Sequence, residues 1–206
     1  MFLKARINYG DFTLWEMNDM QNTGDERILE TIIGRERVFD GLILHIDHIT
    51  AKLPNGKTAK REMAVHVGAS AVVPVDEQGF VYLVRQFRAP IGRTLLEIPA
   101  GKLDAPDEDR LLAARRELHE ETGLTAQRWD WLSDIVTTPG FCNEKISLYL
   151  ARDLERGEAA PDEDEFLNVV KMPFEEACAA VARGEIDDAK TVCALMIARE
   201  RILNER

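Results

Sequence analysis

The feature that most limits the fold of this chain is a change in its hydrophobic period. From about residue 37, short apolar or alternating segments are separated by turn-forming residues, as is typical of β-strands. The segment 107–122 differs, because its apolar residues repeat at helical spacing, and Gly123 follows it where many helices end. The sequence therefore predicts one helix inserted between two groups of strands.

Strand-like segments on both sides of this helix predict a mixed sheet. They are 37–53, 57–67, 69–75, 80–88 and 95–101 before it, and 129–137, 146–152 and 166–172 after it. We expect the first two segments to form one hairpin, and the next two to form a second hairpin in the centre of a sheet. Two helices, 174–183 and 189–204, are predicted to close the chain. This pattern indicates an α+β fold with α/β/α layers.

Length and charge narrow the class of function. A chain of 206 residues fits one domain, or one domain with a small appendage. A net charge of −11 disfavours nucleic acid as a partner, because a phosphate backbone is bound mainly by Lys and Arg. A small phosphorylated substrate stays compatible, because carboxylates can bind phosphate through bridging cations. The run of acidic residues in 155–165 is interpreted as a solvated loop.

The cysteines and the hydrophobic pattern indicate a cytoplasmic protein. Cys142, Cys178 and Cys193 have no framework spacing, which favours a reducing compartment over a disulfide scaffold. The first ten residues contain no long apolar stretch of the kind found in signal peptides. No segment approaches the roughly 18 apolar residues that a membrane span needs, so no membrane partner is expected.

The predicted central helix carries an acidic edge. At 3.6 residues per turn, Glu117, Glu120 and Glu121 lie within about 100° of arc, beside the apolar face rather than on it. Like charges this close repel one another, so the clustering of the three carboxylates needs an explanation. Hard divalent cations such as Mg²⁺ or Mn²⁺ supply one, because they prefer oxygen ligands. The alternative is a solvated helix face neutralised by Arg115, Arg116 and His119.

The residues around the acidic edge favour the metal interpretation. The segment 101–124 resembles the Nudix box, G-x5-E-x7-R-E-U-x-E-E-x-G-U, where U is a bulky aliphatic residue. The matching positions are Gly101, Glu108, Arg116, Glu117, Leu118, Glu120, Glu121, Gly123 and Leu124. Six residues instead of five separate Gly101 from Glu108, which we interpret as a one-residue insertion near Ala105 and Pro106. The departure affects Glu108, which in this family supports the site more than it binds metal.

The resemblance implies a reaction and a set of ligands. In the Nudix family the box glutamates hold divalent metal ions that bridge a diphosphate and activate a water molecule. Glu117 and Glu121 are implied as principal ligands, with Glu120 close by, and Arg116 as the residue that positions them. The implied cofactor is Mg²⁺, with Mn²⁺ also possible, and the implied substrate is a small nucleoside-diphosphate compound.

Segments outside the box resemble the ADP-ribose pyrophosphatase branch of the family. They are LLEIPAGKL before the box, VRQFRAPIGR upstream of it and TTPGFCNEKISLYLA after it. The resemblance implies that the carbonyl of Ala100 binds metal and that Glu144 acts as a base or as an additional ligand. It also implies that the substrate is bound by Arg88, Arg61, Glu62 and Glu97. An exposed arginine at a strand end, or a surface glutamate before a strand, remains the plain alternative for Arg88 and Glu144.

The branch also implies how the chain is organised. Residues 1–66 are expected to form a small N-terminal β-hairpin region that takes part in dimerisation, and residues 67–206 the Nudix hydrolase domain. A homodimer is therefore implied. The branch stacks adenine on an aromatic residue, for which Phe39 is a candidate, although we expect Phe39 to lie in the core.

Three hypotheses of function follow. The leading one is hydrolysis of ADP-ribose to AMP and ribose 5-phosphate. A second keeps the chemistry but takes another nucleoside-diphosphate sugar, such as GDP-mannose. A third, of another class, is a nucleotide sensor without catalysis, although binding alone would not need an acidic edge for several metal ions. An interaction protein that uses the loop 155–165 rests only on a run of charge.

Overall fold

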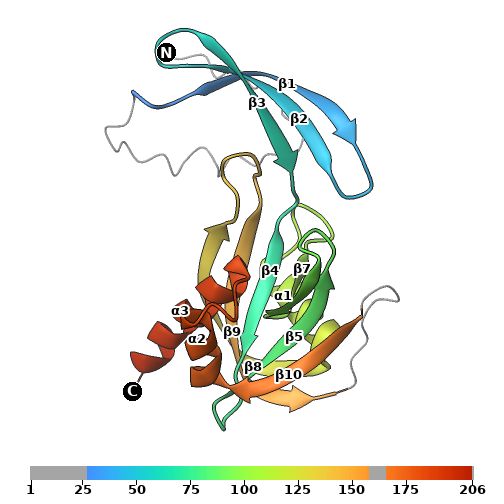
Figure 1. Cartoon of the computed structure of the whole chain (residues 1–206), viewed down its shortest axis with the longest axis vertical. Coiled ribbons are helices and arrows are strands. Elements are labelled where there is room, and N and C mark those ends of the chain that lie inside the picture. Colours follow the sequence, from blue (N-terminus) through green and yellow to red (C-terminus); the bar gives the residue numbers. More distant parts are fainter. Residues whose placement is uncertain (1–26, 158–165, 206) are drawn as a thin grey trace. The chain divides into compact units, whose positions relative to one another are not determined.

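The computed structural model describes residues 27–157 and 166–205 (Figure 1). The polar stretch 18–25 and most of the acidic loop 155–165 lie outside these ranges. The chain divides into two compact units, Met1–Ala64 and Val65–Arg206. The predicted assignment of 1–66 to a dimerisation region and 67–206 to a hydrolase domain stays a prediction. Among the described residues, no helix is long and apolar enough to cross a membrane.

The N-terminal unit is a three-stranded sheet in the order β1-β2-β3. Its strands are β1 (Thr31–Asp40), β2 (His45–Lys52) and β3 (Thr58–Val65). The prediction of one strand over 37–53 is wrong, because a turn closed by a 2.8 Å bond from the Gly41 amide to the Leu44 carbonyl separates β1 from β2. The expectation that Phe39 is a core residue is also wrong, since it is 55% exposed on β1.

The C-terminal unit contains two sheets and three helices (Figure 1). One sheet has the order β7-β4-β9-β8 and the other the order β10-β5-β6. The strands are β4 (Ala69–Pro74), β5 (Phe80–Arg88), β6 (Arg93–Glu97), β7 (Ala100–Lys102), β8 (Leu124–Val136), β9 (Lys145–Arg156) and β10 (Leu167–Pro173). The helices are α1 (Arg110–Thr122), α2 (Phe174–Ala182) and α3 (Ala189–Leu203). Because β4 runs parallel to β9 while β7 and β8 are antiparallel to their neighbours, the sheet is mixed, which confirms the predicted fold class.

The second predicted hairpin is wrong. The turn at 76–79 closes as expected, with the Asp76 amide donating to the Phe80 carbonyl at 2.9 Å. However, β4 and β5 belong to different sheets and share only an isolated bridge between Val75 and Val81. A turn sequence specifies a change of direction, but it does not specify the sheet that the next strand joins.

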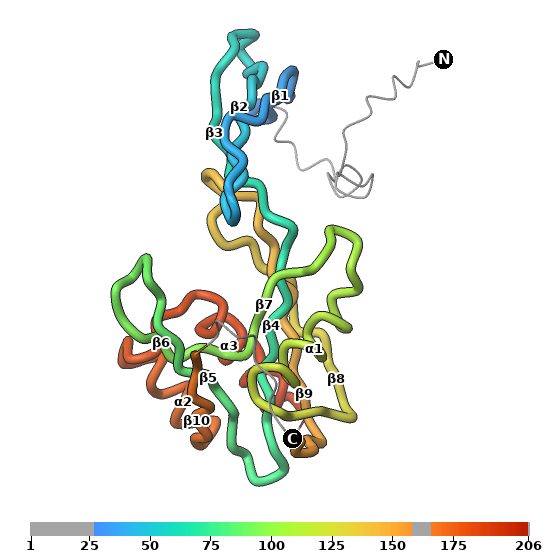
Figure 2. The backbone as a smooth tube through the Cα atoms, turned by 90° about the vertical axis from the view of Figure 1, so that its right-hand side faces the viewer, coloured from blue at the N-terminus to red at the C-terminus, as the bar shows by residue number. Residues whose placement is uncertain are grey.

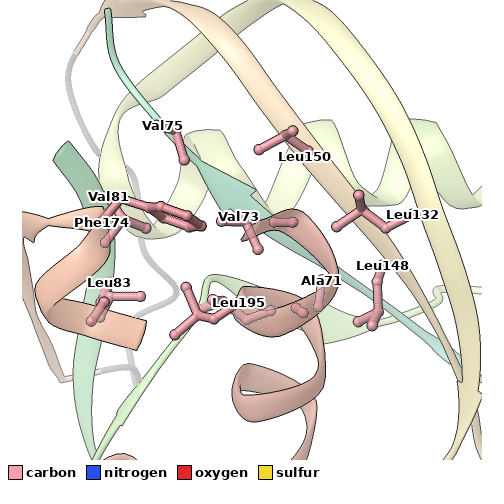
Figure 3. Packing of buried hydrophobic residues seen from close by; sticks show 14 of the residues in the cluster. Ala71, Val73, Val75, Val81, Leu83, Leu132, Leu148, Leu150, Phe174 and Leu195 are labelled. Atoms are coloured by element: carbon pink, nitrogen blue, oxygen red, sulfur yellow. The ribbon is translucent and has the colours of Figure 1, made fainter. Parts of the chain in front are cut away.

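Strand β4 is the centre of this unit, and all of its residues are buried. Side chains alternate between the two faces of a strand. Ala71 and Val73 accordingly pack with Leu195 of α3 in one cluster (Figure 3), whereas Val72 packs with Leu118 of α1 in another. The helices α1 and α3 therefore cover opposite faces of the β7-β4-β9-β8 sheet (Figure 2).

Both ends of α1 follow from the sequence. The Asp109 side chain accepts bonds from the amides of Leu111 at 2.8 Å and Leu112 at 3.0 Å, so the helix begins at Arg110 rather than near 107. Asp and Asn are preferred at this position because they satisfy amides that have no partner within the helix. At the other end Gly123 adopts φ = 69°, a left-handed conformation that glycine reaches without strain.

Candidate active site

The acidic edge of α1 is largely buried against the sheet. Glu117 is 7% exposed and Glu121 is 3% exposed, although both are charged residues. Such residues are almost never fully buried unless they are paired. The neighbouring Leu118 anchors the helix in the core, which fixes the direction of this edge. The carboxylates therefore have a defined environment, unlike those of a solvated helix face.

Gly101 permits this arrangement. It lies on β7, opposite Ser70 of β4, where the strand passes directly over the α1 edge. A Cβ atom at Gly101 would lie only 2.1 Å from the carboxyl carbon of Glu117. The glycine is needed for space rather than for an unusual backbone conformation, because its φ is not positive.

Arg116 links the parts of the acidic edge. Its Nη1 donates to Glu117 at 2.6 Å and to Glu120 at 3.3 Å, and its Nη2 donates to the Lys102 carbonyl at 3.2 Å. Glu108 supports the loop before the helix, since its carboxylate accepts from the Asp104 amide at 2.6 Å and lies 3.6 Å from Arg116. Arg116 thus holds two of the carboxylates and the strand that faces them in one arrangement.

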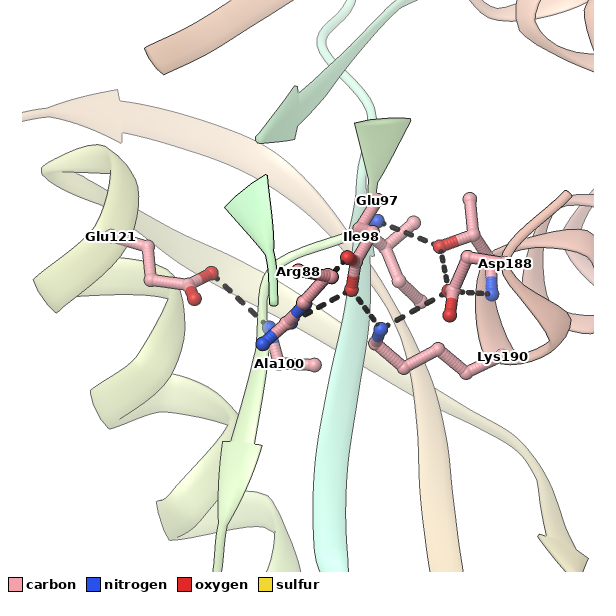
Figure 4. Close-up of polar contacts among 8 residues, drawn as sticks. Arg88, Glu97, Ile98, Ala100, Glu121, Asp188 and Lys190 are labelled. Carbon is pink, nitrogen blue, oxygen red and sulfur yellow. Dashed lines mark hydrogen bonds and ion pairs between the residues drawn. The ribbon is translucent and has the colours of Figure 1, made fainter. Parts of the chain in front are cut away.

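Arg88 and Glu97 form a second ionic group beside this edge (Figure 4). The Arg88 guanidinium donates to both oxygens of Glu97, at 2.7 and 2.8 Å. Glu97 is 1% exposed, and Lys190 of α3 also donates to it. Burial favours the neutral acid, but the bond from Arg88 and the charge of Lys190 outweigh this effect. The pKa of Glu97 consequently lies below its ordinary value.

The turn between Glu97 and Gly101 is fixed from two sides (Figure 4). The Ile98 amide donates to the Thr191 hydroxyl of α3 at 3.0 Å, and the Ala100 amide donates to Glu121 of α1 at 3.2 Å. The side chain of Asp188 accepts from the Thr191 amide and thereby caps α3. This turn therefore connects the ionic group of Glu97 with the acidic edge of α1.

Glu144 lies in the loop before β9, between Thr137 and His66. The Thr137 hydroxyl donates to one carboxylate oxygen at 2.7 Å, and His66 Nε2 lies 3.5 Å from the other. Glu144 therefore lies at the same end of the sheet as Gly101 and Lys102, where Ala69 of β4 pairs with Lys102 on one side and with Ile146 on the other.

The proton on His66 can be assigned from its bonds. The Gly68 amide donates to Nδ1 at 3.0 Å, so Nδ1 is an acceptor and Nε2 carries the proton that faces Glu144. Burial lowers the pKa of His66, although the charge of Glu144 acts in the opposite direction. Asn143 fastens the same loop, because its side chain accepts from the His66 amide at 2.7 Å and donates to the His66 carbonyl at 3.3 Å.

The family of this chain follows from a comparison of its sequence with models of known protein families. The NUDIX domain model matches residues 64–195, which include both ionic groups and the loop of Glu144. The chain belongs to the NUDIX domain family. The acidic edge of α1, with the glycine that faces it, is the part of the chain that resembles the Nudix box.

Relatives agree with this assignment over most of the chain. The chain is 41% identical to the ADP-ribose pyrophosphatase of Bacillus subtilis, covering 81% of this chain and 90% of that protein. It is 39% identical, with the same coverage, to the methanol dehydrogenase activator of Bacillus methanolicus. The GDP-mannose pyrophosphatase of Cronobacter sakazakii is 38% identical but covers 62% of this chain and 71% of its own length. A solved structure of an ADP compounds hydrolase superposes with a TM-score of 0.75 at 25% identity, covering 85% of this chain and 95% of that one.

The acidic edge of the NUDIX domain offers oxygen donors, which are the ligands that hard divalent cations prefer. The carboxylates of Glu117 and Glu121 are buried; Glu121 accepts from the Ala100 amide, and the Glu117 carboxylate occupies the space that a Cβ atom at Gly101 would need. Within residues 27–157 and 166–205, no three His, Cys, Asp or Glu side chains converge as metal ligands. Arg116 instead bonds to two of the carboxylates. The predicted ligand roles of Ala100, Glu117, Glu120 and Glu121 stay predictions.

Two of the predicted substrate contacts lie outside the NUDIX match. Arg61 and Glu62 lie on β3 in the N-terminal unit, where Arg61 donates to Glu30 at 2.5 Å and Glu62 lies 3.8 Å from His48. Their contact with substrate stays a prediction, as does the direct contact of Glu97, whose two oxygens both face cations. Of the other arginines before the box, Arg93 pairs with Asp187.

Sequence reasoning missed the residues that hold the predicted ones. Lys190 lies 93 positions from Glu97, and Asn143 fastens the loop of the predicted Glu144 to His66, 77 positions away. No local spacing could have connected them. The only available signal was Asp188, which precedes a predicted helix as a capping residue does and stands two residues before Lys190.

Proposed function

We propose that this chain is a metal-dependent pyrophosphohydrolase that cleaves the diphosphate of ADP-ribose to give AMP and ribose 5-phosphate. The observation that carries the proposal is the buried acidic edge of Glu117 and Glu121, which Arg116 organises beside Arg88 and Glu97. Identity of 41% to an ADP-ribose pyrophosphatase over most of both chains supports the choice of substrate.

The proposed cofactor is Mg²⁺, with Mn²⁺ as a possible substitute. Glu117, Glu120, Glu121 and the carbonyl of Ala100 would hold it. When bound, such an ion would stabilise negative charge on the diphosphate and make a water molecule a stronger nucleophile. This proposal rests on the acidity and burial of the site and on its hard oxygen donors.

The residues of the chain divide the remaining work. Arg116 keeps the carboxylates in place, and the fork of Arg88 suits a phosphate oxygen with the N–H groups that Glu97 does not use. Glu144 lies on a loop at the same end of the sheet and can accept the proton of the attacking water. Thr137 holds one oxygen of this carboxylate by a hydrogen bond, and His66 lies 3.5 Å from the other.

We also propose a cytoplasmic homodimer in which the N-terminal unit takes part in the contact. The support is the resemblance to the branch, together with large exposed apolar residues on β1 and the turn after it, such as Ile33, Phe39 and Leu42. The three cysteines are free, which suits a reducing compartment. The molar mass in solution, measured by light scattering, tests the dimer, and the mass of one chain would contradict it.

A substrate panel tests the function. ADP-ribose, GDP-mannose, UDP-glucose, NADH and diadenosine polyphosphates are offered side by side with Mg²⁺, and the products are separated by chromatography. We expect ADP-ribose to be the best substrate and AMP to appear. Hydrolysis of GDP-mannose without hydrolysis of ADP-ribose would favour the second candidate, which the match to GDP-mannose pyrophosphatases supports. Tight binding of ADP-ribose without turnover would indicate a sensor.

Replacement of Glu144 tests its assignment as a base. Glu144→Gln is expected to lower kcat by about 10²-fold, as is typical when a general base is lost, and to leave metal binding nearly unchanged. The matched control is Glu155→Gln on β9, an exposed acid that accepts a hydrogen bond from Gln127. Calorimetric titration with Mn²⁺ measures metal binding in each variant. Equal loss of metal binding and activity would make Glu144 a ligand instead.

A further inference from the structure

Lys190 is a largely covered cation that the proposed reaction has not used. Its side chain is 12% exposed and contacts two acids, Glu97 and Asp188, the latter at 3.1 Å. Glu97 is shared, because Arg88 donates to both of its oxygens while Lys190 donates to one of them (Figure 4). One buried carboxylate thus faces two cations.

This sharing determines the charge that Arg88 presents. Without Lys190, the acids Glu97 and Asp188 would outnumber Arg88, and the group would carry a net negative charge that repels a phosphate. Lys190 brings the group of four to neutrality, so the exposed guanidinium of Arg88 can attract a phosphate. Arg88 is the member of the group with an exposed side chain, at 40%, and it lies close enough to Glu121 for the two charges to interact.

The position of Lys190 is fixed independently of Glu97. Asp188 caps α3 by accepting from the Thr191 amide at 3.0 Å, and the same carboxylate holds the Lys190 ammonium. The Thr191 hydroxyl accepts from the Ile98 amide, next to Glu97. The first turn of α3 is therefore joined to the strand that carries Glu97 at two points.

We propose that Lys190 is a positioning residue that tunes Arg88 through Glu97 for binding of the substrate diphosphate. The proposal deepens the proposed function and rests on it for the identity of the substrate. Lys190 acts on affinity and not on the bond-breaking step, because it lies behind Glu97 and touches no reacting group.

Substitutions at Lys190 separate its charge from its hydrogen bond. Lys190→Met removes both, Lys190→Gln keeps a donor without charge, and Lys190→Arg keeps the charge. We expect the Met and Gln variants to raise KM for ADP-ribose about ten-fold, the effect of weakening one charge-assisted contact, with kcat within about two-fold of the original. Lys190→Arg should restore most of the affinity. The matched control is Lys171→Met on β10, which removes a lysine that pairs with Asp76.

A double-mutant cycle with Arg88→Lys decides whether Lys190 acts through Arg88. In the Arg88→Lys background, Lys190→Met should have little further effect on KM, since coupled residues are not additive. Thermal melting of each variant reports on folding, and Lys190→Gln keeps the test informative if Lys190→Met does not fold. Full additivity, or a Lys190→Gln variant with the original KM, would overturn the proposal.

Binding of ADP, measured by calorimetry on the same variants, keeps this test separate from that of the function. ADP carries the diphosphate but needs no turnover to be detected. If the unaltered chain does not hydrolyse ADP-ribose, the proposed function fails, whereas weaker ADP binding by the Met and Gln variants would still support the role of Lys190. Equal ADP affinity in all variants, or no ADP binding by the unaltered chain, would overturn the inference.

Discussion

Glu121→Gln is expected to lower the kcat of ADP-ribose hydrolysis by about two to three orders of magnitude and to leave the fold intact. The size follows from the loss of several kcal/mol of charge stabilisation in the transition state, with each 1.4 kcal/mol worth about ten-fold in rate. Glu121 is the most buried carboxylate of the acidic edge, at 3% exposure, and it lies beside the Ala100 backbone. Its charge therefore acts where little water screens it.

The fold should tolerate this change because glutamine is nearly the same size. The amide oxygen of the new side chain can still accept the bond that the Ala100 amide donates at 3.2 Å. Melting temperature and circular dichroism should thus remain close to those of the unaltered chain. Calorimetric titration with Mn²⁺ should show weaker binding, which would connect the loss of activity to the loss of a ligand.

The control for Glu121→Gln is Glu176→Gln on α2. Glu176 is an exposed acid that pairs with Arg183 and lies outside the proposed site, so its replacement should change neither kcat nor metal binding. If Glu121→Gln keeps full activity, the assignment of metal to the acidic edge is wrong. If it unfolds, the carboxylate has a structural role that geometry alone does not show.

The central helix and its chemistry could be predicted because their determinants are local. The acidic edge, the capping residue Asp109 and the terminal Gly123 all lie within one short segment. Helical spacing alone places Glu117 and Glu121 on one edge and Leu118 on an adjacent face. The structure retains this arrangement, with the two carboxylates buried and Leu118 in the core.

The arrangement of the strands could not be predicted in the same way. The segment 37–53 contains the turn-forming dipeptide Asp40-Gly41, but its continuous apolar pattern favours a single strand where the structure has two. The sequence predicts the turn at 76–79, but the sheet that β5 joins depends on β10, which is distant in sequence, as well as on the neighbouring β6. Local signals fix where the chain turns, whereas burial of whole surfaces decides which strands pair.

The supporting residues of the site depend on the same distant contacts. The sequence pattern indicates only a strand at His66, yet its Nε2 lies 3.5 Å from Glu144. The pattern likewise indicates only a terminal helix at Lys190, yet Lys190 donates to Glu97. The sequence therefore predicts the residues that a family motif names, and the structure adds those that orient them.

Gly101→Ala is expected to lower kcat by about 100-fold, because a displacement of about 1 Å in an active site can have an effect of this size. The new Cβ would lie 2.1 Å from the Glu117 carboxyl carbon and cannot coexist with it. The carboxylate is the far end of a flexible side chain, so it should move aside while β7 and α1 stay in place. We expect the free energy of unfolding to fall by about 1–3 kcal/mol, as for other overpacked sites.

The cause of this loss can be tested by combining substitutions. If Gly101→Ala acts by displacing Glu117, then Gly101→Ala combined with Glu117→Gln should be no slower than Glu117→Gln alone. Gly34→Ala on β1 is the matched control, because its Cβ would meet Thr50 at an ordinary distance of 3.6 Å. A Gly101→Ala variant with unchanged kcat would mean that the Glu117 carboxylate is not required where the structure places it. A multiplicative loss in the combined variant would instead assign the effect to the β7 backbone, and the ligand role of Ala100 would become the next one to measure.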